Sequence, residues 1–146
     1  MELFELTAHE LKDLLDGKKA SAVEITQSVL DRIQNVEEKV GSYVTVCRDE
    51  ALNRAKAVQE KIDKGQSASL LGGIPMALKD NICTEGVKTT CASNMLNNFV
   101  PPYNATVAKK LFDEDTVLLG KLNMDEFAMG GSTENSFFKK TCNPWD

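Results

Sequence analysis

The sequence predicts an α/β fold in which amino-terminal helices are followed by part of a mixed sheet. Three features support this: amphipathic helical periodicity up to about residue 65, two short apolar runs typical of buried strands, and a helical pattern between those runs. A strand, a helix and a second strand in succession favour a parallel strand pair. We therefore expect residues 1–146 to belong to a single domain that is helical over 1–69 and α/β over 70–146.

The helical region opens on two capping boxes. In each, a hydroxyl and a carboxylate three residues apart satisfy backbone N–H groups of the first helical turn. The boxes occupy residues 7–10 and 21–24, and apolar residues at helical spacing follow both. We expect the first helix to end at Gly17 and the second near Gly41, because glycine commonly ends a helix.

Three strands are expected further along the chain. Residues 43–47 are rich in β-branched side chains and predict a short strand, after which a third helix runs to Gly65. The apolar residues 74–78 predict a buried strand, and residues 116–119 predict another that Gly120 closes. Two of these strands flank the remaining helix, so we expect them to lie in one sheet.

The segments around these strands are expected to be loops and short helices. Residues 84–102 show no period and predict a surface loop of a length that is commonly functional. Asn104 is expected to cap the helix between the strands, and residues 123–126 form another capping pattern, led by Asn123, that predicts a further short helix. Met124, Phe127 and Met129 are expected to lie in the core and not to contact a cofactor. Residues 129–136 form a loop with two glycines and several hydroxyls, which is either a ligand-binding loop or a plain polar turn.

Composition argues against several classes of protein. The net charge is −5 and the pI about 5.0, without a stripe of Lys and Arg, so direct nucleic-acid binding is not expected. No apolar run approaches the roughly 18 residues of a membrane span, and the acidic amino terminus is unlike a signal peptide. We expect a cytoplasmic protein with no membrane partner. The four irregularly spaced cysteines, with His9 as the single histidine, predict no metal site and reduced thiols mostly in the core.

Lys79 is a lysine at the end of the first buried apolar run. Two interpretations are open: the ammonium leaves the sheet for water, or a dry pocket holds the amine neutral as a base. The second requires lowering a reference pKa of about 10.4 by roughly 3 units, on the order of 4 kcal/mol. Full burial can supply such a shift. The apolar run alone does not decide between the two.

The pair Gly120 and Lys121 forms part of a phosphate-binding loop pattern. Asp115 stands where that pattern needs its first glycine, and Leu122 stands where it needs the hydroxyl that holds magnesium. We therefore expect no such loop here.

Five motifs resemble successive motifs of the amidase signature family, and within it those of glutamine-dependent tRNA amidotransferases. The resemblance implies the amidase signature fold, with this chain as the amino-terminal part of a single amidase domain. It also implies a truncation, because the family's Gly/Ser-rich signature should follow the last motif. The motifs are GGIPMALKDNI at 72–82, TTCAS at 89–93, NFVPPYNATV at 98–107, LLGKLNMDEFAMGGSTENS at 118–136 and NPWD at 143–146.

The resemblance also implies the catalytic roles. Lys79 matches the family's base, which serves a serine in a cis peptide conformation that in turn activates a second, nucleophilic serine. Both serines are expected beyond residue 146, because none of Ser93, Ser132 and Ser136 matches their positions. The chain alone is therefore expected to be inactive.

A second implied site lies in the loop after the NMDEFAMGG motif. By resemblance, the backbone around Met129, Gly130 and Gly131 lines the pocket for the substrate amide. No metal ligand and no cofactor are implied for this chain.

The implied reaction is glutamine hydrolysis that supplies ammonia to a partner, within a heterotrimer completed by the B and C subunits of the amidotransferase. The B partner would use ATP and magnesium to convert Glu-tRNA(Gln) to Gln-tRNA(Gln), and the small C partner would bind the pair together. The chain would thus reach tRNA through the complex. Two alternatives stay open. The chain belongs to a general amidase of small amides, or it is a non-catalytic fragment that binds the other subunits.

Overall fold

The computed structural model describes residues 2–66 and 69–145, which form a mixed α/β structure, so the predicted class is confirmed. None of the helices in these ranges is long and apolar enough to cross a membrane. The α-helices are α1 (Ala8–Asp16), α2 (Ala22–Val40), α3 (Arg48–Asp63) and α4 (Thr106–Asp113). The strands are β1 (Tyr43–Val46), β2 (Pro75–Lys79) and β3 (Val117–Leu122), and the 3₁₀ helices are η1 (Leu3–Glu5), η2 (Asn94–Leu96) and η3 (Glu126–Ala128).

The chain divides into two compact units, each built from three segments. All the predicted site residues, Lys79 and residues 129–131, lie in the second unit. The first unit comprises Met1–Gln34, Cys47–Met76 and Lys110–Leu119, and the second comprises Asn35–Val46, Ala77–Lys109 and Gly120–Asp146.

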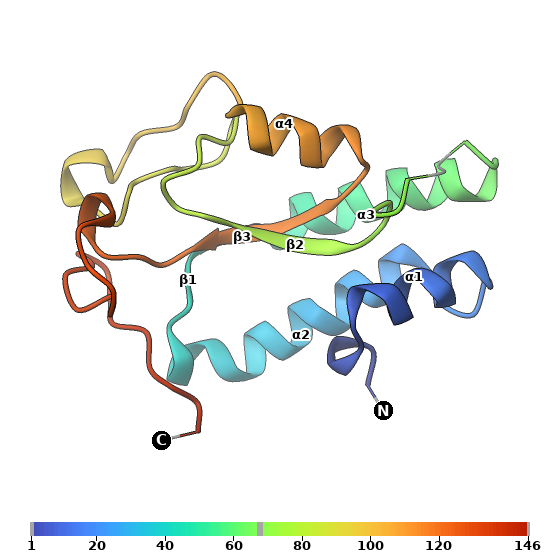
Figure 1. Ribbon diagram of the computed structural model, residues 1–146, viewed down its shortest axis with the longest axis horizontal. Helices are drawn as coiled ribbons and strands as arrows, with labels where there is room; N and C mark the ends of the chain where they lie inside the picture. Colours follow the sequence, from blue (N-terminus) through green and yellow to red (C-terminus); the bar gives the residue numbers. More distant parts are fainter. Residues whose placement is uncertain (1, 67–68, 146) are drawn as a thin grey trace. The chain divides into compact units, whose positions relative to one another are not determined.

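Both predicted capping boxes are confirmed in the first unit. At α1, Glu10 donates its backbone N–H to the Thr7 hydroxyl while its carboxylate accepts from the Thr7 backbone. Ser21 and Glu24 exchange the same two bonds at the start of α2. The apolar faces that follow these caps pack together, with α1 and α2 side by side in Figure 1. Their shared core contains Leu11, Leu15, Ala22, Ile25 and Ile74.

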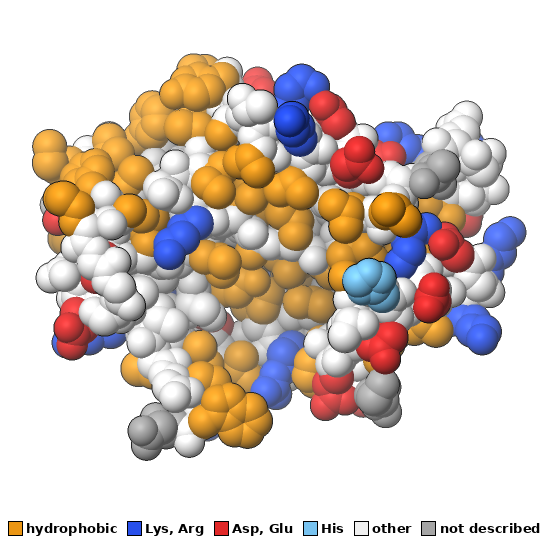
Figure 2. All heavy atoms as spheres, viewed as in Figure 1, with side chains coloured by type: hydrophobic (Ala, Val, Ile, Leu, Met, Phe, Trp, Pro, Cys, Tyr) orange, Lys and Arg blue, Asp and Glu red, His pale blue; other side chains and the backbone are white. Residues whose placement is uncertain are grey.

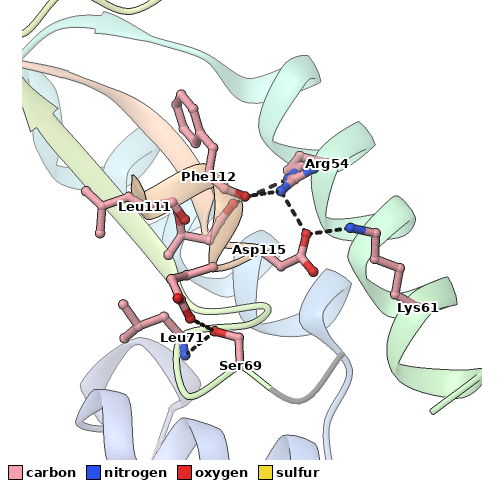
Figure 3. Close-up of polar contacts among 9 residues, drawn as sticks. Arg54, Lys61, Ser69, Leu71, Leu111, Phe112 and Asp115 are labelled. Atoms are coloured by element: carbon pink, nitrogen blue, oxygen red, sulfur yellow. Dashed lines mark hydrogen bonds and ion pairs between the residues drawn. The ribbon is translucent and has the colours of Figure 1, made fainter. Parts of the chain in front are cut away.

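A charged cluster joins α3 to the turn between α4 and β3 in the first unit (Figure 3). The Asp115 carboxylate accepts from Arg54 at 2.9 Å and from Lys61 at 2.7 Å. Arg54 also donates to the carbonyl of Phe112 at 2.8 Å, near the end of α4. The cluster therefore fixes the turn at which the chain enters β3.

The sheet has the order β1-β3-β2, with β3 in the middle. β1 runs antiparallel to β3, and Val46 is opposite Gly120. The prediction that Gly120 ends its strand is wrong, because β3 continues to Leu122. A Cβ at Gly120 would lie 2.1 Å from the Thr45 carbonyl oxygen, so the glycine allows a close approach of the two strands.

The expected parallel pair is formed by β2 and β3, which run side by side in Figure 1. Val117 donates its N–H to the carbonyl of Ile74, directly before β2, and Asp80, directly after β2, donates its N–H to the carbonyl of Leu122. The partners advance in the same direction along both segments, which defines parallel strands. The parallel arrangement brings the residues after β2 and after β3 to one edge of the sheet.

Some local expectations were wrong. Lys109 donates its backbone N–H to the carbonyl of Ala105, so α4 begins one residue later than an Asn104 cap requires. The side chain of Asn104 accepts instead from the backbone N–H of Glu85 at 2.8 Å. Of the cysteines, Cys47 alone is buried, so the expectation that most lie in the core is also wrong.

Candidate active site

Lys79 ends β2 with its side chain exposed, while its neighbours Leu78 and Asp80 are buried. Successive side chains of a strand point to opposite faces, which accounts for this alternation. In the described parts of the chain, no segment covers Lys79. Its exposure matches the first of the two interpretations, in which the ammonium reaches water. The catalytic role of Lys79 stays a prediction.

Asp80 ties the end of β2 to the TTCAS motif. Its buried carboxylate accepts from the hydroxyl of Thr90, from the Thr90 backbone N–H at 3.1 Å and from the Ala92 N–H at 3.4 Å. Its backbone N–H donates to Leu122, and its carbonyl accepts from the N–H of Cys91, both at 3.0 Å. The KDN motif and the TTCAS motif are therefore held together directly after Lys79.

Lys121 completes this cluster and was missed by the sequence analysis. Its side chain is fully buried, and its Nζ lies 3.8 Å from Oδ1 of Asp80. The same Nζ donates to the carbonyl of Ile82 and to the hydroxyl of Thr89, both at 2.8 Å. Among the described residues, Oδ1 of Asp80 has no hydrogen-bond partner, so the Lys121 ammonium is its charge partner. The signal available in the sequence was a lysine one residue beyond a buried apolar run, separated from it by Gly120.

Two pairs of adjacent residues beside this cluster have left-handed backbone. Cys91 and Ala92 have φ of 52° and 53°, and Phe127 and Ala128 have φ of 52° and 62°. Each such residue costs roughly 1–2 kcal/mol for an L-amino acid. The pairs are joined, because Phe127 donates its N–H to the carbonyl of Cys91 at 3.0 Å. Strained backbone of this kind concentrates at functional sites, which supports this region as the candidate site.

Asp125 organises the loop that carries the predicted substrate-binding residues. Its carboxylate accepts backbone N–H groups of Ser132, Thr133 and Asn135, each at 2.9 Å. The hydrogen bond from Asn135, followed by that from Thr133, holds the pKa of the Asp125 carboxyl below its usual range. The loop is therefore an ordered turn around a carboxylate.

The three predicted substrate-binding residues have different surroundings. Met129 is 76% exposed, so the expectation that it belongs to the core is wrong. A Cβ at Gly130 would lie 2.4 Å from Cγ of Asp125, so this glycine is needed by the loop itself. A Cβ at Gly131 would meet no atom within 4 Å. Of the two glycines, Gly131 thus presents backbone that a ligand could approach.

The helix predicted from residue 123 is only the 3₁₀ turn η3, since the side chain of Asn123 is engaged elsewhere. Asn123 is buried, donates to the carbonyl of Lys139 and to the hydroxyl of Thr141, and accepts from the hydroxyl of Ser136. Met124 is buried as expected, whereas Phe127 is exposed.

Hydrogen bonds thus link the end of β2, the TTCAS motif and η3, the segment that leads into residues 129–131. No hydrogen bond or ion pair joins Lys79 to residues 129–131 within the described parts of the chain. Two surface hollows of about 380 and 420 Å³ lie in the first unit and contain none of these residues.

The prediction that residues 84–102 form a loop is confirmed, interrupted only by an isolated bridge and the turn η2. The expectation that this loop lies on the surface is wrong in part, because most of its TTCAS motif is buried. Orange side chains gather over the segment that leads into α4 in Figure 2. Exposed apolar residues of this segment include Met95, Val100 and Tyr103, and Val107 in the first turn of α4 is exposed as well.

The family model and the relatives that match this chain point to the same family. The sequence model of the family described as Amidase matches residues 24–146. The A subunit of a glutamyl-tRNA(Gln) amidotransferase from Thermoanaerobacter pseudethanolicus is 57% identical over all 146 residues, which span 30% of that protein. The chain therefore spans about a third of the length of such relatives.

Two solved structures are also similar. The A subunit of the glutamyl-tRNA(Gln) amidotransferase from Thermotoga maritima is 35% identical with a TM-score of 0.75, covering 100% of this chain and 29% of that one. The native peptide amidase from Stenotrophomonas maltophilia is 27% identical with a TM-score of 0.81, covering 89% of this chain and 27% of that one.

Proposed function

Since this chain belongs to the amidase family, we propose that it is part of the glutamine-hydrolysing subunit of a Glu-tRNA(Gln) amidotransferase. The observation that carries the proposal is 57% identity to the A subunit of such an enzyme over all 146 residues, against 27% to the peptide amidase. The TM-scores of 0.75 and 0.81 do not separate the two, because both proteins share the fold. Sequence identity, not fold, favours the amidotransferase.

In the proposed reaction Lys79 acts as the base. Its neutral amine removes a proton from a bridging serine, and the second serine attacks the side-chain amide of glutamine. The proton of the second serine passes to the bridging serine as the attack occurs. When the C–N bond breaks, the proton taken up by Lys79 returns through the bridging serine to the leaving nitrogen, so ammonia leaves and the acyl group stays on the second serine. Water then hydrolyses this acyl-enzyme and releases glutamate. Both serines would come from a part of the protein outside these 146 residues.

The base has to lose its charge at neutral pH, and the described residues leave Lys79 exposed. We propose that the segment carrying the serines covers Lys79. Desolvation then disfavours the ammonium, and hydroxyl groups that donate to the amine favour its neutral form. This separates two tasks: the strand end presents the lysine, and the covering segment favours its neutral form.

The released ammonia would pass to the B partner, which uses ATP and magnesium to convert Glu-tRNA(Gln) to Gln-tRNA(Gln), with the C partner binding the pair. The substrate amide would lie against the backbone of residues 129–131. The open space beside Gly131 supports this part of the proposal.

The test is ammonia release by the complete protein that contains this chain, with glutamine and a panel of simple amides as substrates. We expect hydrolysis of glutamine to be preferred, ammonia to be transferred to tRNA-bound glutamate when the B and C partners are present, and the 146-residue chain alone to be inactive. Good hydrolysis of other amides without transfer would establish a general amidase instead. Complex formation with the two partners without any hydrolysis would establish a binding fragment.

A further inference from the structure

We infer that Lys121 is a positioning residue for the proposed reaction: through Asp80 and Ile82 it fixes the backbone that presents Lys79. The inference rests on the proposed function, because it concerns the placement of the proposed base. Lys121 itself is fully buried and does not reach substrate, so its role is exerted through these neighbours.

The contacts of Lys121 lie on the segment that directly follows the base. Its Nζ pairs with Asp80, the next residue after Lys79, and donates to the carbonyl of Ile82, three residues after it. Its third contact, with the hydroxyl of Thr89, reaches the segment that Asp80 also holds. One ammonium thus joins the strand end to the TTCAS motif.

The alternation of the strand keeps this cluster separate from the reacting face. Asp80 and Lys121 are buried, whereas Lys79 points to the opposite face of β2 and is exposed. A lysine side chain is a flexible chain of four methylene groups. Its amine can therefore be held near a serine hydroxyl only if the backbone that carries it is fixed. Proton transfer needs the two atoms about 2.6–3.2 Å apart.

Loss of the Lys121 charge would affect this arrangement through Asp80. The carboxylate would remain buried without a cation, a costly state from which the segment relaxes by moving or by admitting water. A misplacement of about 1 Å can lower a rate by about 100-fold. We therefore expect an effect on turnover in addition to any effect on stability.

The experiment uses the complete protein with the double substitution Asp80→Asn and Lys121→Met. Removing both charges avoids an unpaired buried ion, which favours a folded variant. Ammonia release from glutamine gives kcat and KM, with kcat corrected for the folded fraction. The expected result is a kcat lowered about 10-fold or more with KM within about twofold of the wild type, because positioning changes the reaction and not substrate binding. A kcat within about twofold of the wild type would overturn the inference.

If the double variant does not fold, Thr89→Val decides the question. This change keeps both charges and the side-chain shape while removing the hydroxyl that accepts from Lys121. A lowered kcat with unchanged KM supports the inference, and an unchanged kcat overturns it. The matched control is Asp31→Asn with Arg48→Met, which removes an exposed ion pair and should leave kcat unchanged.

Lys79→Ala distinguishes failure of the inference from failure of the proposed function. If this variant keeps its activity, Lys79 is not the base and the proposed mechanism fails. If it is inactive while the Asp80/Lys121 variant turns over normally, the inference about Lys121 fails on its own.

Discussion

The two units each contain an aspartate that is paired with cations, and the two clusters differ in burial. In the first unit Asp115 has two short contacts, to Arg54 and Lys61, whose side chains are 36% and 44% exposed (Figure 3). In the second unit Asp80 has one longer contact of 3.8 Å to Lys121, and both side chains are 0% exposed. Solvent weakens the first cluster and not the second. We therefore expect burial, and not the number or length of the contacts, to decide how much stability is lost when one partner of each cluster is removed.

The largest loss of folding stability is expected when the buried pair of Asp80 and Lys121 is broken. Lys121→Met should lower the free energy of unfolding by about 3–5 kcal/mol, because it leaves the Asp80 carboxylate buried without its cation. Adding Asp80→Asn should restore part of this loss. Urea denaturation of both variants measures the difference. Equal losses in the single and double variants would show that the pair does not act as a unit.

The Asp115 cluster, whose cations are partly exposed while Asp115 itself is 13% exposed, should lose less stability on substitution. Asp115→Ala should cost about 1–2 kcal/mol, partly from two solvent-screened ion pairs and partly because Asp115 has a left-handed φ of 56° that alanine tolerates poorly. Asp115→Asn should cost less, since asparagine tolerates this backbone and can still accept from Arg54. The same denaturation measurement applies. A loss as large as that of Lys121→Met would contradict the comparison.

The smallest change in stability is expected from protonation of Asp125, whose carboxylate accepts hydrogen bonds from backbone N–H groups. Its pKa is lower in the folded protein than in the unfolded chain, where it is about 3.9. Its contribution is therefore fully present above that pH and is lost as the pH falls through the lower folded value. Amide hydrogen exchange at Ser132, Thr133 and Asn135, compared at pH 5 and pH 3 after correction for intrinsic rates, should show opening at low pH. Asp125→Asn should remove this pH dependence; if it persists, another group causes it.

Local signals in the sequence predicted most of the fold because they act over a few residues. The capping boxes at residues 7–10 and 21–24 identify the helix starts on their own. The prediction that Asn104 and Asn123 cap helices is wrong, because each side chain forms a hydrogen bond with a residue distant in sequence. Asn104 accepts from Glu85, and Asn123 donates to Lys139. Such contacts become visible only once the chain is folded.

The candidate site was only partly predictable for the same reason. Lys79 was identified as a strand-end lysine, and its exposure matches one of the two environments considered. Lys121 was missed because Gly120 was expected to end the strand, which would place the lysine in a surface turn. In fact the glycine lies within β3 and lets β1 approach closely, so the lysine stays buried. The requirement for Gly130 likewise depends on Asp125, five residues earlier.

The most direct test of the central claim is glutamine hydrolysis by the complete protein with Lys79→Ala. General-base catalysis contributes about 10²–10⁴-fold to a rate, so kcat should fall at least about 100-fold. Lys88→Ala serves as the matched control, because Lys88 is another exposed lysine in the same unit. Loss of activity in the first variant alone is the result we predict. Wild-type turnover by Lys79→Ala would contradict the assignment of this residue as the base.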